Sequence, residues 1–247
     1  MDRWRYFDIT HRDHDIMNPM SSEKLDEMIG LLRLPQGAKV LDIGCGKAEP
    51  LVRLAERYVI DGVGVDPSPG VIAAAKLRAQ ARVRPPSKVE FQLARGADFQ
   101  GEPNSFDLTM CVGASFAFSG YRGTLQALAH LTRPQGLILV GEPYWLQDPS
   151  PAYLQQGGLQ ADEFATYAGN VAIALELGLT PLYAVCSSKE DFDRYEWLQV
   201  QAAERFALEH PHDPDVPELL QRLRANRDLY LRYGRDTLGW ALYLFRK

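Results

Sequence analysis

Two closely spaced glycines follow an apolar run in the stretch VLDIGCGKAEP, residues 40–50. Gly44 and Gly46 allow a ligand to approach the backbone closely, because glycine has no side chain and readily adopts left-handed conformations. Asp42 lies near the end of the apolar run, and helix-forming residues begin after the second glycine. A strand, a glycine-containing turn and a helix in this order predict a loop that binds a nucleotide.

The position three residues after the second glycine distinguishes two classes of nucleotide. A dinucleotide-binding loop has a third glycine there, whereas this sequence has Glu49. A carboxylate in the first helical turn is expected to repel a pyrophosphate, which disfavours NAD(P). Asp42, with Glu49 as a second candidate, is instead expected to face an ammonium group. S-adenosylmethionine carries such a group on its amino acid moiety.

A second acidic residue follows in GVGVDPSPG, residues 62–70. Asp66 lies 22 residues after Gly44, close to the spacing of about 20 residues at which a strand-end acid binds ribose hydroxyls. The alternative is a plain βα turn, with Asp66 capping the next helix. The predicted cofactor-binding residues in these two motifs are Asp42, Gly44, Cys45, Gly46, Asp66 and Pro67.

The elements that position these residues alternate between strands and helices over residues 37–187. Strands are expected at 39–43, 62–65, 89–93, 106–112, 137–140 and 181–186, and helices at 47–58, 69–83, 121–131 and 162–177, with a loop at 143–158. This alternation predicts a doubly wound α/β fold, in which a mostly parallel sheet has helices on both faces. Ligands of such sheets bind beyond the carboxyl ends of the strands.

Three further segments complete the expected organisation. Residues 1–36 contain a helix from about residue 22 and are predicted to form a lid. Residues 188–236 contain two helices, at about 190–208 and 217–233, which the sheet itself does not need and which we interpret as a cap. Residues 237–247 supply the last of seven strands of a Rossmann-like sheet.

These motifs resemble those of the class I S-adenosylmethionine-dependent methyltransferases over residues 36–142. VLDIGCGKAE is similar to the first motif of that family and GVGVDPSPGVIAAAK to the second. NSFDLTMC and LTRPQGLILVGEP resemble the fourth strand and the segment after it. HRDHDIMNPMS and GEPYW are similar to a bacterial subgroup of small-molecule type. The resemblance implies methyl transfer to a small-molecule acceptor, with S-adenosylhomocysteine as the product.

One position departs from the pattern of this family. An Asp that commonly binds the adenine amino group is replaced by Arg95, and the nearest acid is Asp98. The backbone around Gly96 and Ala97 is expected to hold the adenine, with Asp98 reaching in; the alternative is that Asp98 is a solvated loop carboxylate. Cys111, at the end of the next strand, is a further cofactor-binding candidate and is otherwise expected to be a buried, inert thiol.

Catalytic candidates come from the residues around the same crevice. Methyl transfer from a sulfonium is an in-line displacement, which needs alignment, exclusion of water and in some cases a general base. Glu142 follows an apolar strand, so burial is expected to raise its pKa and make it a base, unless it pairs with an arginine. His11 and His14 are further candidates for the base, with a solvated or capping role as the alternative. No metal site is predicted.

Aromatic residues are candidates for the wall of the acceptor pocket. Tyr144 and Trp145 follow Glu142 directly, and Tyr144 is also counted among the catalytic candidates. Their ring faces favour a cationic methyl-sulfonium or a flat acceptor, although aromatic side chains serve equally often as ordinary packing. Gly113 and Tyr195 complete the predicted acceptor-binding set.

Composition limits the partners of the protein. The chain has 247 residues, 46% of them hydrophobic, and a formal net charge of −5. The acidic balance disfavours nucleic acid and anionic membranes as partners, and no apolar run approaches the length of a membrane span. Three scattered cysteines are typical of a reduced, cytoplasmic protein, expected as a monomer or homodimer. An NAD(P)-dependent oxidoreductase and a noncatalytic S-adenosylmethionine-binding module remain the alternative functions.

Overall fold

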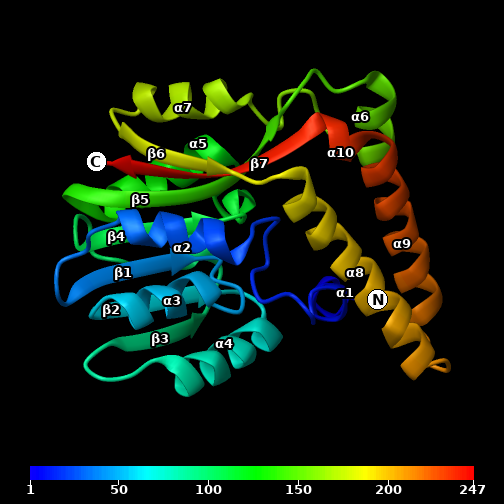
Figure 1. Ribbon diagram of the computed structural model, residues 1–247, viewed down its shortest axis with the longest axis horizontal. Coiled ribbons are helices and arrows are strands. Elements are labelled where there is room, and N and C mark those ends of the chain that lie inside the picture. Colours follow the sequence, from blue (N-terminus) through cyan, green and yellow to red (C-terminus); the bar gives the residue numbers. More distant parts are fainter.

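Seven strands form one sheet in a computed structural model that describes residues 1–247 (Figure 1). The strand order is β3-β2-β1-β4-β5-β7-β6, and β7 alone runs antiparallel to its neighbours. The strands are β1 (Ala38–Ile43), β2 (Ile60–Asp66), β3 (Lys88–Leu93), β4 (Phe106–Val112), β5 (Thr132–Trp145), β6 (Thr180–Cys186) and β7 (Leu238–Arg246). The predicted doubly wound, mostly parallel fold is confirmed.

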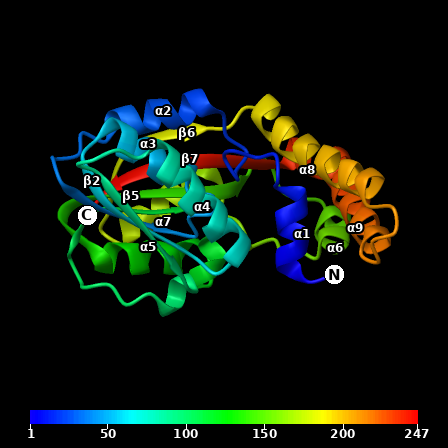
Figure 2. The same cartoon turned by 90° about the horizontal axis from the view of Figure 1, so that it is seen from below.

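Helices cover both faces of the sheet (Figure 2). One face carries α2 (Ser22–Leu31), α3 (Glu49–Arg57) and α4 (Pro69–Arg82), and the other carries α5 (Tyr121–Leu131) and α7 (Tyr167–Glu176). Each face has its own apolar core, because side chains of a central strand alternate between the two sides. In β1, for example, Val40 belongs to one core and Leu41 to the other.

A lobe of four helices lies beyond the carboxyl ends of β1, β4 and β5 (Figures 1 and 2). It consists of α1 (Arg3–Thr10), α6 (Pro151–Gly157), α8 (Lys189–Glu209) and α9 (Val216–Leu229). We refer to these four helices as the helical lobe. Tyr6 and Ile9 of α1 pack with Leu219 and Leu223 of α9 in a small separate core. The N-terminal segment is thereby attached to helices about 200 residues away along the chain.

Two helices of the lobe were not predicted. The sequence of α1 alternates charged and apolar residues without a clear helical stripe, and its stability comes from packing in the lobe. The predicted loop at 143–158 contains α6, whose start has a standard signal: Ser150 accepts a hydrogen bond from the Tyr153 amide, and Pro151 follows it.

Other boundaries differ because of tertiary pairing. The strand predicted at 137–140 runs from Thr132 to Trp145, since β7 pairs with it as far as Trp145 opposite Leu238. The helix predicted at 162–177 begins only at Tyr167, with Thr166 as its N-cap. The last predicted helix ends at Leu229 and continues as a π-helical turn over 230–234 and the short α10 (Arg235–Thr237).

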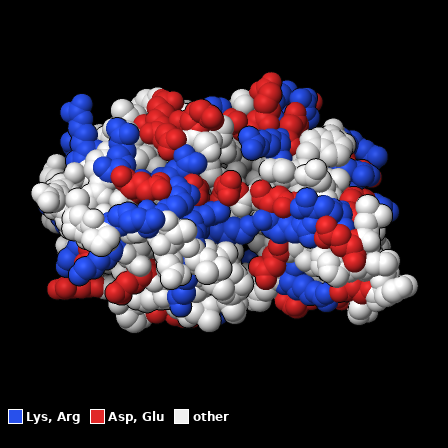
Figure 3. Space-filling model, turned by 60° about the horizontal axis from the view of Figure 1, so that its bottom comes forward, with Lys and Arg blue, Asp and Glu red and all other residues white.

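Charged side chains of both signs are interspersed on the surface. Figure 3 shows Lys and Arg adjoining Asp and Glu across one face. Four arginines of the C-terminal segments make ion pairs, namely Arg205 with Asp13, Arg224 with Glu204, Arg227 with Asp228 and Arg235 with Asp193. None of the helices has the length and apolar character needed to cross a membrane.

Candidate active site

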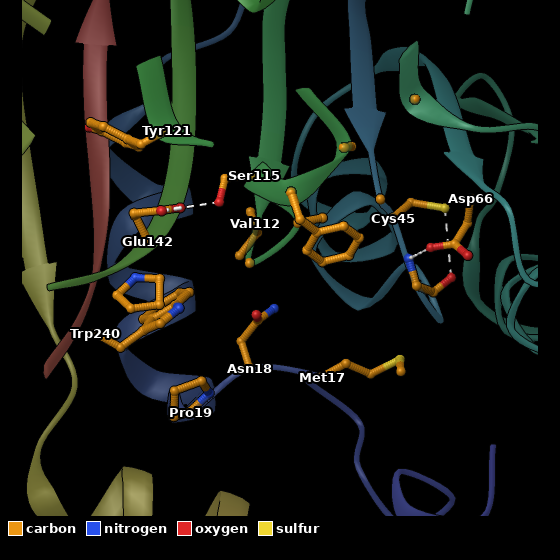
Figure 4. A pocket seen from close by; sticks show the side chains of 18 of the residues that line it. Met17, Asn18, Pro19, Cys45, Asp66, Val112, Ser115, Tyr121, Glu142 and Trp240 are labelled. Carbon is orange, nitrogen blue, oxygen red and sulfur yellow. Dashed lines mark hydrogen bonds between the residues drawn. The ribbon is translucent and has the colours of Figure 1, made fainter. Parts of the chain in front are cut away.

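A cavity of about 1480 Å³ lies between the carboxyl edge of the sheet and the helical lobe. Its volume exceeds the roughly 300–1,000 Å³ of ordinary small-molecule sites, so a nucleotide and a second molecule fit together. Figure 4 shows Cys45 and Asp66 at one end of the cavity and Glu142 and Tyr121 at the other. We call these the donor end and the acceptor end.

The glycine loop after β1 forms the wall of the donor end. Gly44 and Gly46 have φ angles of +70° and +52°, in the left-handed region. A side chain at Gly44 would overlap the methyl group of Ala114, so only glycine fits there. The amides of Gly44 and Cys45 donate to the Val65 carbonyl at 2.8 and 3.1 Å, which fixes the loop against the end of β2. The backbone is therefore held open toward the cavity.

Asp66 connects the two predicted motifs by hydrogen bonds. Its carboxylate accepts hydrogen bonds from the Gly46 amide at 3.1 Å and the Ser68 amide at 2.9 Å. Burial raises the pKa of Asp66 in spite of these bonds. The N-cap of α4 is Ser68, so the alternative in which Asp66 caps that helix is not what the structure shows. Each carboxylate oxygen can accept a second hydrogen bond, and Asp66 and Pro67 both line the cavity.

Asp42 is a buried carboxylate with no partner. Its side chain lines the donor end, and the residue is 1% exposed. The Oδ1 atom makes no hydrogen bond, and burial, together with the charge of Asp66, raises the pKa of Asp42 to about 8. A buried, unsatisfied acceptor is costly unless a ligand supplies a donor. The site therefore fits a ligand that carries an ammonium group.

Glu49 does not share this role, contrary to expectation. Its carboxylate accepts hydrogen bonds from Arg53 at 2.7 Å and Arg82 at 2.6 Å, and lies 3.2 Å from Arg78. Three guanidinium groups leave no net negative charge to attract an ammonium or repel a pyrophosphate. Repulsion of a pyrophosphate by Glu49 is therefore not a valid argument against NAD(P). Arg53 is four residues after Glu49 on α3, but Arg78 and Arg82 lie on α4, and their contact with Glu49 could not be predicted from spacing.

The predicted adenine contacts divide into two groups. Gly96 lines the cavity, and a side chain on Gly96 would come 2.5 Å from the Ile43 side chain, so only glycine fits there. Ala97 and Asp98 do not line the cavity, and the Asp98 side chain is 67% exposed beside Arg95. Cys111 lies behind the wall, fully buried in the core, where burial raises its thiol pKa.

Glu142 occupies the floor of the acceptor end (Figure 4). The residue is 3% exposed, and its Oε1 accepts a hydrogen bond from Ser115 at 3.0 Å, while Oε2 is buried without a partner. Burial raises the pKa of Glu142 to about 7. No arginine pairs with Glu142, so the alternative in which it forms an ion pair with an arginine does not hold. The arrangement can accept a proton near neutral pH.

Three residues near Glu142 were not among the predicted site residues. The Tyr121 hydroxyl is buried without a hydrogen-bond partner, and Tyr121 lines the acceptor end. Asn18 packs against Gly113, where a side chain would overlap the Asn18 amide oxygen, and Gly113 also has a left-handed φ of +75°. Trp240 of β7 lies beside Glu142 in Figure 4. No local motif marks Asn18, Tyr121 and Trp240, because they come from three separate segments of the chain.

The two N-terminal histidines lie behind the cavity wall. His11 Nε2 is 2.9 Å from the Tyr195 hydroxyl, and His14 Nε2 is 2.9 Å from the Tyr195 carbonyl oxygen. Burial lowers the pKa of His11 to about 3 and also lowers that of His14. Neither lines the cavity, whereas Tyr195 does. As placed here, they are neutral residues that position Tyr195 rather than bases facing the acceptor end.

Tyr144 and Trp145 pack away from the cavity. Tyr144 is buried against Tyr167, with ring centroids 5.4 Å apart, and Trp145 donates its indole N–H to the Ala161 carbonyl at 2.9 Å. Neither residue lines the cavity, because β5 continues past it while paired with β7. Tyr144 and Trp145 therefore serve as ordinary packing residues. Of the predicted acceptor-binding residues, Gly113 and Tyr195 line the cavity.

Comparison with known proteins identifies the cofactor. The family model of a methyltransferase domain matches residues 40–136. Two solved S-adenosylmethionine-dependent methyltransferases with bound S-adenosyl-L-homocysteine are similar over nearly the whole chain. The protein from Thiobacillus denitrificans is 32% identical, with a TM-score of 0.90 and 99% of each chain covered. The protein from Geobacter sulfurreducens is 31% identical, with a TM-score of 0.88 and coverage of 98% of this chain and 97% of that one.

A curated relative, the 27-O-demethylrifamycin SV methyltransferase of Amycolatopsis mediterranei, is 28% identical over 90% of this chain and 82% of its own. The chain belongs to the class I S-adenosylmethionine-dependent methyltransferases. It is a methyltransferase whose cofactor is S-adenosylmethionine, which sets aside both the oxidoreductase and the noncatalytic module.

Proposed function

We propose that the protein transfers a methyl group to a small molecule bound at the acceptor end, with Glu142 as the general base. The observation that carries this proposal is the buried, unpartnered Oε2 of Glu142 in a cavity of about 1480 Å³. A cavity of this size holds a cofactor and a small acceptor side by side. The similarity to a rifamycin methyltransferase also supports a small-molecule acceptor.

The donor end fits S-adenosylmethionine, which supplies an electrophilic methyl group when bound. We assign Asp42 to the ammonium group, because its carboxylate is buried without a partner. Asp66 binds the ribose hydroxyls with the acceptor capacity that its two backbone bonds leave free. The remaining contacts come from the loop backbone and the adjoining turns, at Gly44, Cys45, Gly46, Pro67 and Gly96, all of which line the cavity.

At the acceptor end, Glu142 takes the proton that the nucleophile loses. The hydrogen bond from Ser115 fixes one carboxylate oxygen, so the other faces the acceptor in a defined orientation. Tyr121, Tyr195 and Trp240 form the surrounding wall. The helical lobe and the N-terminal segment cover this end and exclude water, which protects the methyl group from hydrolysis.

Calorimetry of the purified protein tests the cofactor and the cavity together. We expect S-adenosylmethionine and S-adenosylhomocysteine to bind at micromolar concentrations and NADH not to bind. A screen of small-molecule acceptors, detected by release of S-adenosylhomocysteine, then tests the reaction. Binding of NADH alone, or methyl transfer only to nucleic acid or protein, contradicts the proposal.

Asp66→Ala is expected to weaken S-adenosylmethionine binding by about 1–3 kcal/mol, because the ribose loses a charged acceptor. The loop also loses the bonds that Asp66 accepts from Gly46 and Ser68. Calorimetry measures the change, and Asp61→Ala, at the exposed opposite end of β2, is the control. An affinity equal to wild type removes Asp66 from the donor site.

Lys47→Met is expected to release the N-terminal segment from the donor loop. The Lys47 ammonium donates to the carbonyls of His11, Arg12 and His14 at 2.7, 3.0 and 3.2 Å. Loss of these charged bonds lowers the free energy of unfolding by about 1–3 kcal/mol and exposes residues 11–15 to protease. Thermal melts and limited proteolysis measure both effects, with Lys76→Met on the exposed side of α4 as the control. Unchanged proteolysis at the N-terminal segment contradicts this role.

A further inference from the structure

We propose that the methyl acceptor carries a positively charged nitrogen and that Glu196 of α8 binds it. This inference rests on the proposed function, because it concerns the acceptor end of the same cavity. Glu196 lines the cavity from the helical lobe, whereas Glu142 lines it from the sheet. An acceptor that reaches both walls meets one carboxylate at each.

Glu196 has no charge partner in the protein. Glu196 is partly buried and makes no hydrogen bond or ion pair. Burial raises the pKa of its carboxyl group to about 7. Two other acids of α8 are paired, since Asp191 binds Lys24 and Asp193 binds Arg235, whereas Glu190 is exposed to solvent. A carboxylate left unpaired at a partly buried position of a ligand cavity costs stability, and a cationic ligand offsets that cost.

Three of the four cations that line the cavity, Lys47, Arg95 and Arg122, have partners within the protein. Lys47 is held by three backbone carbonyls, and Arg122 pairs with Glu176. Arg95 is 78% exposed beside Asp98. Arg3 lies over the rings of Trp4 and Phe116, 5.3 and 5.4 Å from their centroids. An anionic acceptor would therefore meet two carboxylates, Glu142 and Glu196, with Arg3 as the one lining cation that has no anionic or carbonyl partner.

Aromatic rings of the cavity lining favour the same ligand class. Phe192 and Glu196 are four residues apart on α8, so they share one face of the helix, and both line the cavity. Trp4 and Phe116 already face Arg3, and the further aromatic side chains of the lining are Phe7, Tyr121, Phe164, Tyr195 and Trp240. Ring faces attract cations, and the attraction increases when water is excluded. A carboxylate beside such rings favours an ammonium group over an alcohol or a carboxylate.

The second, independent mark of a ligand is the pair of orphaned polar atoms at the floor. Glu142 Oε2 and the Tyr121 hydroxyl are both buried without a partner, in residues 3% and 8% exposed. A nitrogen or hydroxyl of the acceptor placed between them would satisfy both. Glu196 then selects which acceptors bind, and Glu142 acts as the general base for the bound acceptor.

The test uses three probes of matched size with the full-length protein saturated with S-adenosylhomocysteine at pH 8. Phenethylamine is cationic, 2-phenylethanol neutral and 3-phenylpropionate anionic at this pH. Binding is followed by calorimetry and by fluorescence of Trp4 and Trp240, which line the cavity. We expect the amine to bind about ten-fold more tightly than either of the others, the size of one charged hydrogen bond.

Glu196→Gln is expected to remove this preference, with about a ten-fold loss for the amine and no change in S-adenosylhomocysteine affinity. Glu190→Gln, an exposed acid on the same helix, is the matched control and retains the preference. The inference is overturned if the carboxylate or alcohol binds as tightly as the amine, if no amine binding is detected, or if Glu196→Gln leaves amine affinity unchanged. Failure of S-adenosylhomocysteine to bind, or of any small acceptor to be methylated, counts instead against the proposed function.

Discussion

Glu142→Gln is expected to slow methyl transfer by about 10²–10⁴-fold, the usual contribution of a general base. Donor affinity stays at the wild-type value, because Glu142 lies at the acceptor end and the donor loop at the other. Glutamine keeps the size of the side chain and can still accept the Ser115 hydrogen bond. Turnover with an identified acceptor and calorimetry with S-adenosylmethionine measure the two quantities separately.

The role of Glu142 as a base also predicts how the rate of methyl transfer changes with pH. A base acts in its deprotonated form, and burial raises the pKa of Glu142 to about 7. The rate of the wild-type enzyme should therefore rise with pH through about 7, and Glu142→Gln should lack that rise. Ser115→Ala removes the hydrogen bond that lowers the pKa, so it should shift the rise to higher pH. Wild-type turnover by Glu142→Gln would reduce Glu142 to a structural residue.

Asp42→Asn is expected to have the second large effect. It should weaken binding of the cofactor and stabilise the ligand-free protein. The ammonium of the cofactor loses a charged hydrogen-bond partner, so affinity for S-adenosylmethionine should fall by about 1.5–3 kcal/mol. The ligand-free protein should become more stable above neutral pH, because a buried carboxylate without a partner is replaced by a neutral amide. Calorimetry and thermal melts of the same preparation measure both effects.

The sign of the stability change follows from the two pKa values. The folded pKa of Asp42 is about 8, against an ordinary value of 3.8, so the folded protein holds the proton more tightly than the unfolded chain. The stability that protonation contributes is complete below pH 3.8 and is lost as the pH rises to about 8. Glu142 and Glu196 add to this loss as the pH rises from 4.5 to about 7.

Thermal melts of the ligand-free protein between pH 6.5 and 8.5, above the range in which the lowered pKa values of His11 and His14 affect stability, should therefore show wild-type stability falling with pH. The fall should be smaller in Asp42→Asn, where the group with a pKa of about 8 no longer titrates. Asp98→Asn, an exposed carboxylate outside the cavity, is the control. A fall as steep in Asp42→Asn as in wild type, or unchanged cofactor affinity, would contradict the role given to Asp42.

The sheet and the donor end could be predicted because their signals are local. Strands buried on both faces are short apolar runs, and the helices between them begin at caps and prolines such as Ser68 and Pro69. The turn conformation at Gly44 depends on the residue type at that position. Asp66 follows from its place at the end of the next parallel strand, since neighbouring parallel strands end at the same edge.

The helical lobe was only partly predictable. The helices α8 and α9 have recognisable caps and length, but α1 is stable mainly because Tyr6 and Ile9 pack on residues about 200 positions later. The position of the histidines depends on the same contact. Once α1 packs on the lobe, His11 and His14 lie against Tyr195, and burial leaves them neutral.

The sequence by itself determined the class of fold, the cofactor and the edge of the sheet where the cofactor binds. Only the tertiary structure decided which carboxylates are free to act. Glu49 is neutralised by arginines from two helices, whereas Asp42, Glu142 and Glu196 have no cationic partner. The physical reason is that the pKa and reactivity of a buried acid depend on burial and on charges within a few ångströms. Those neighbours come from segments far apart along the chain.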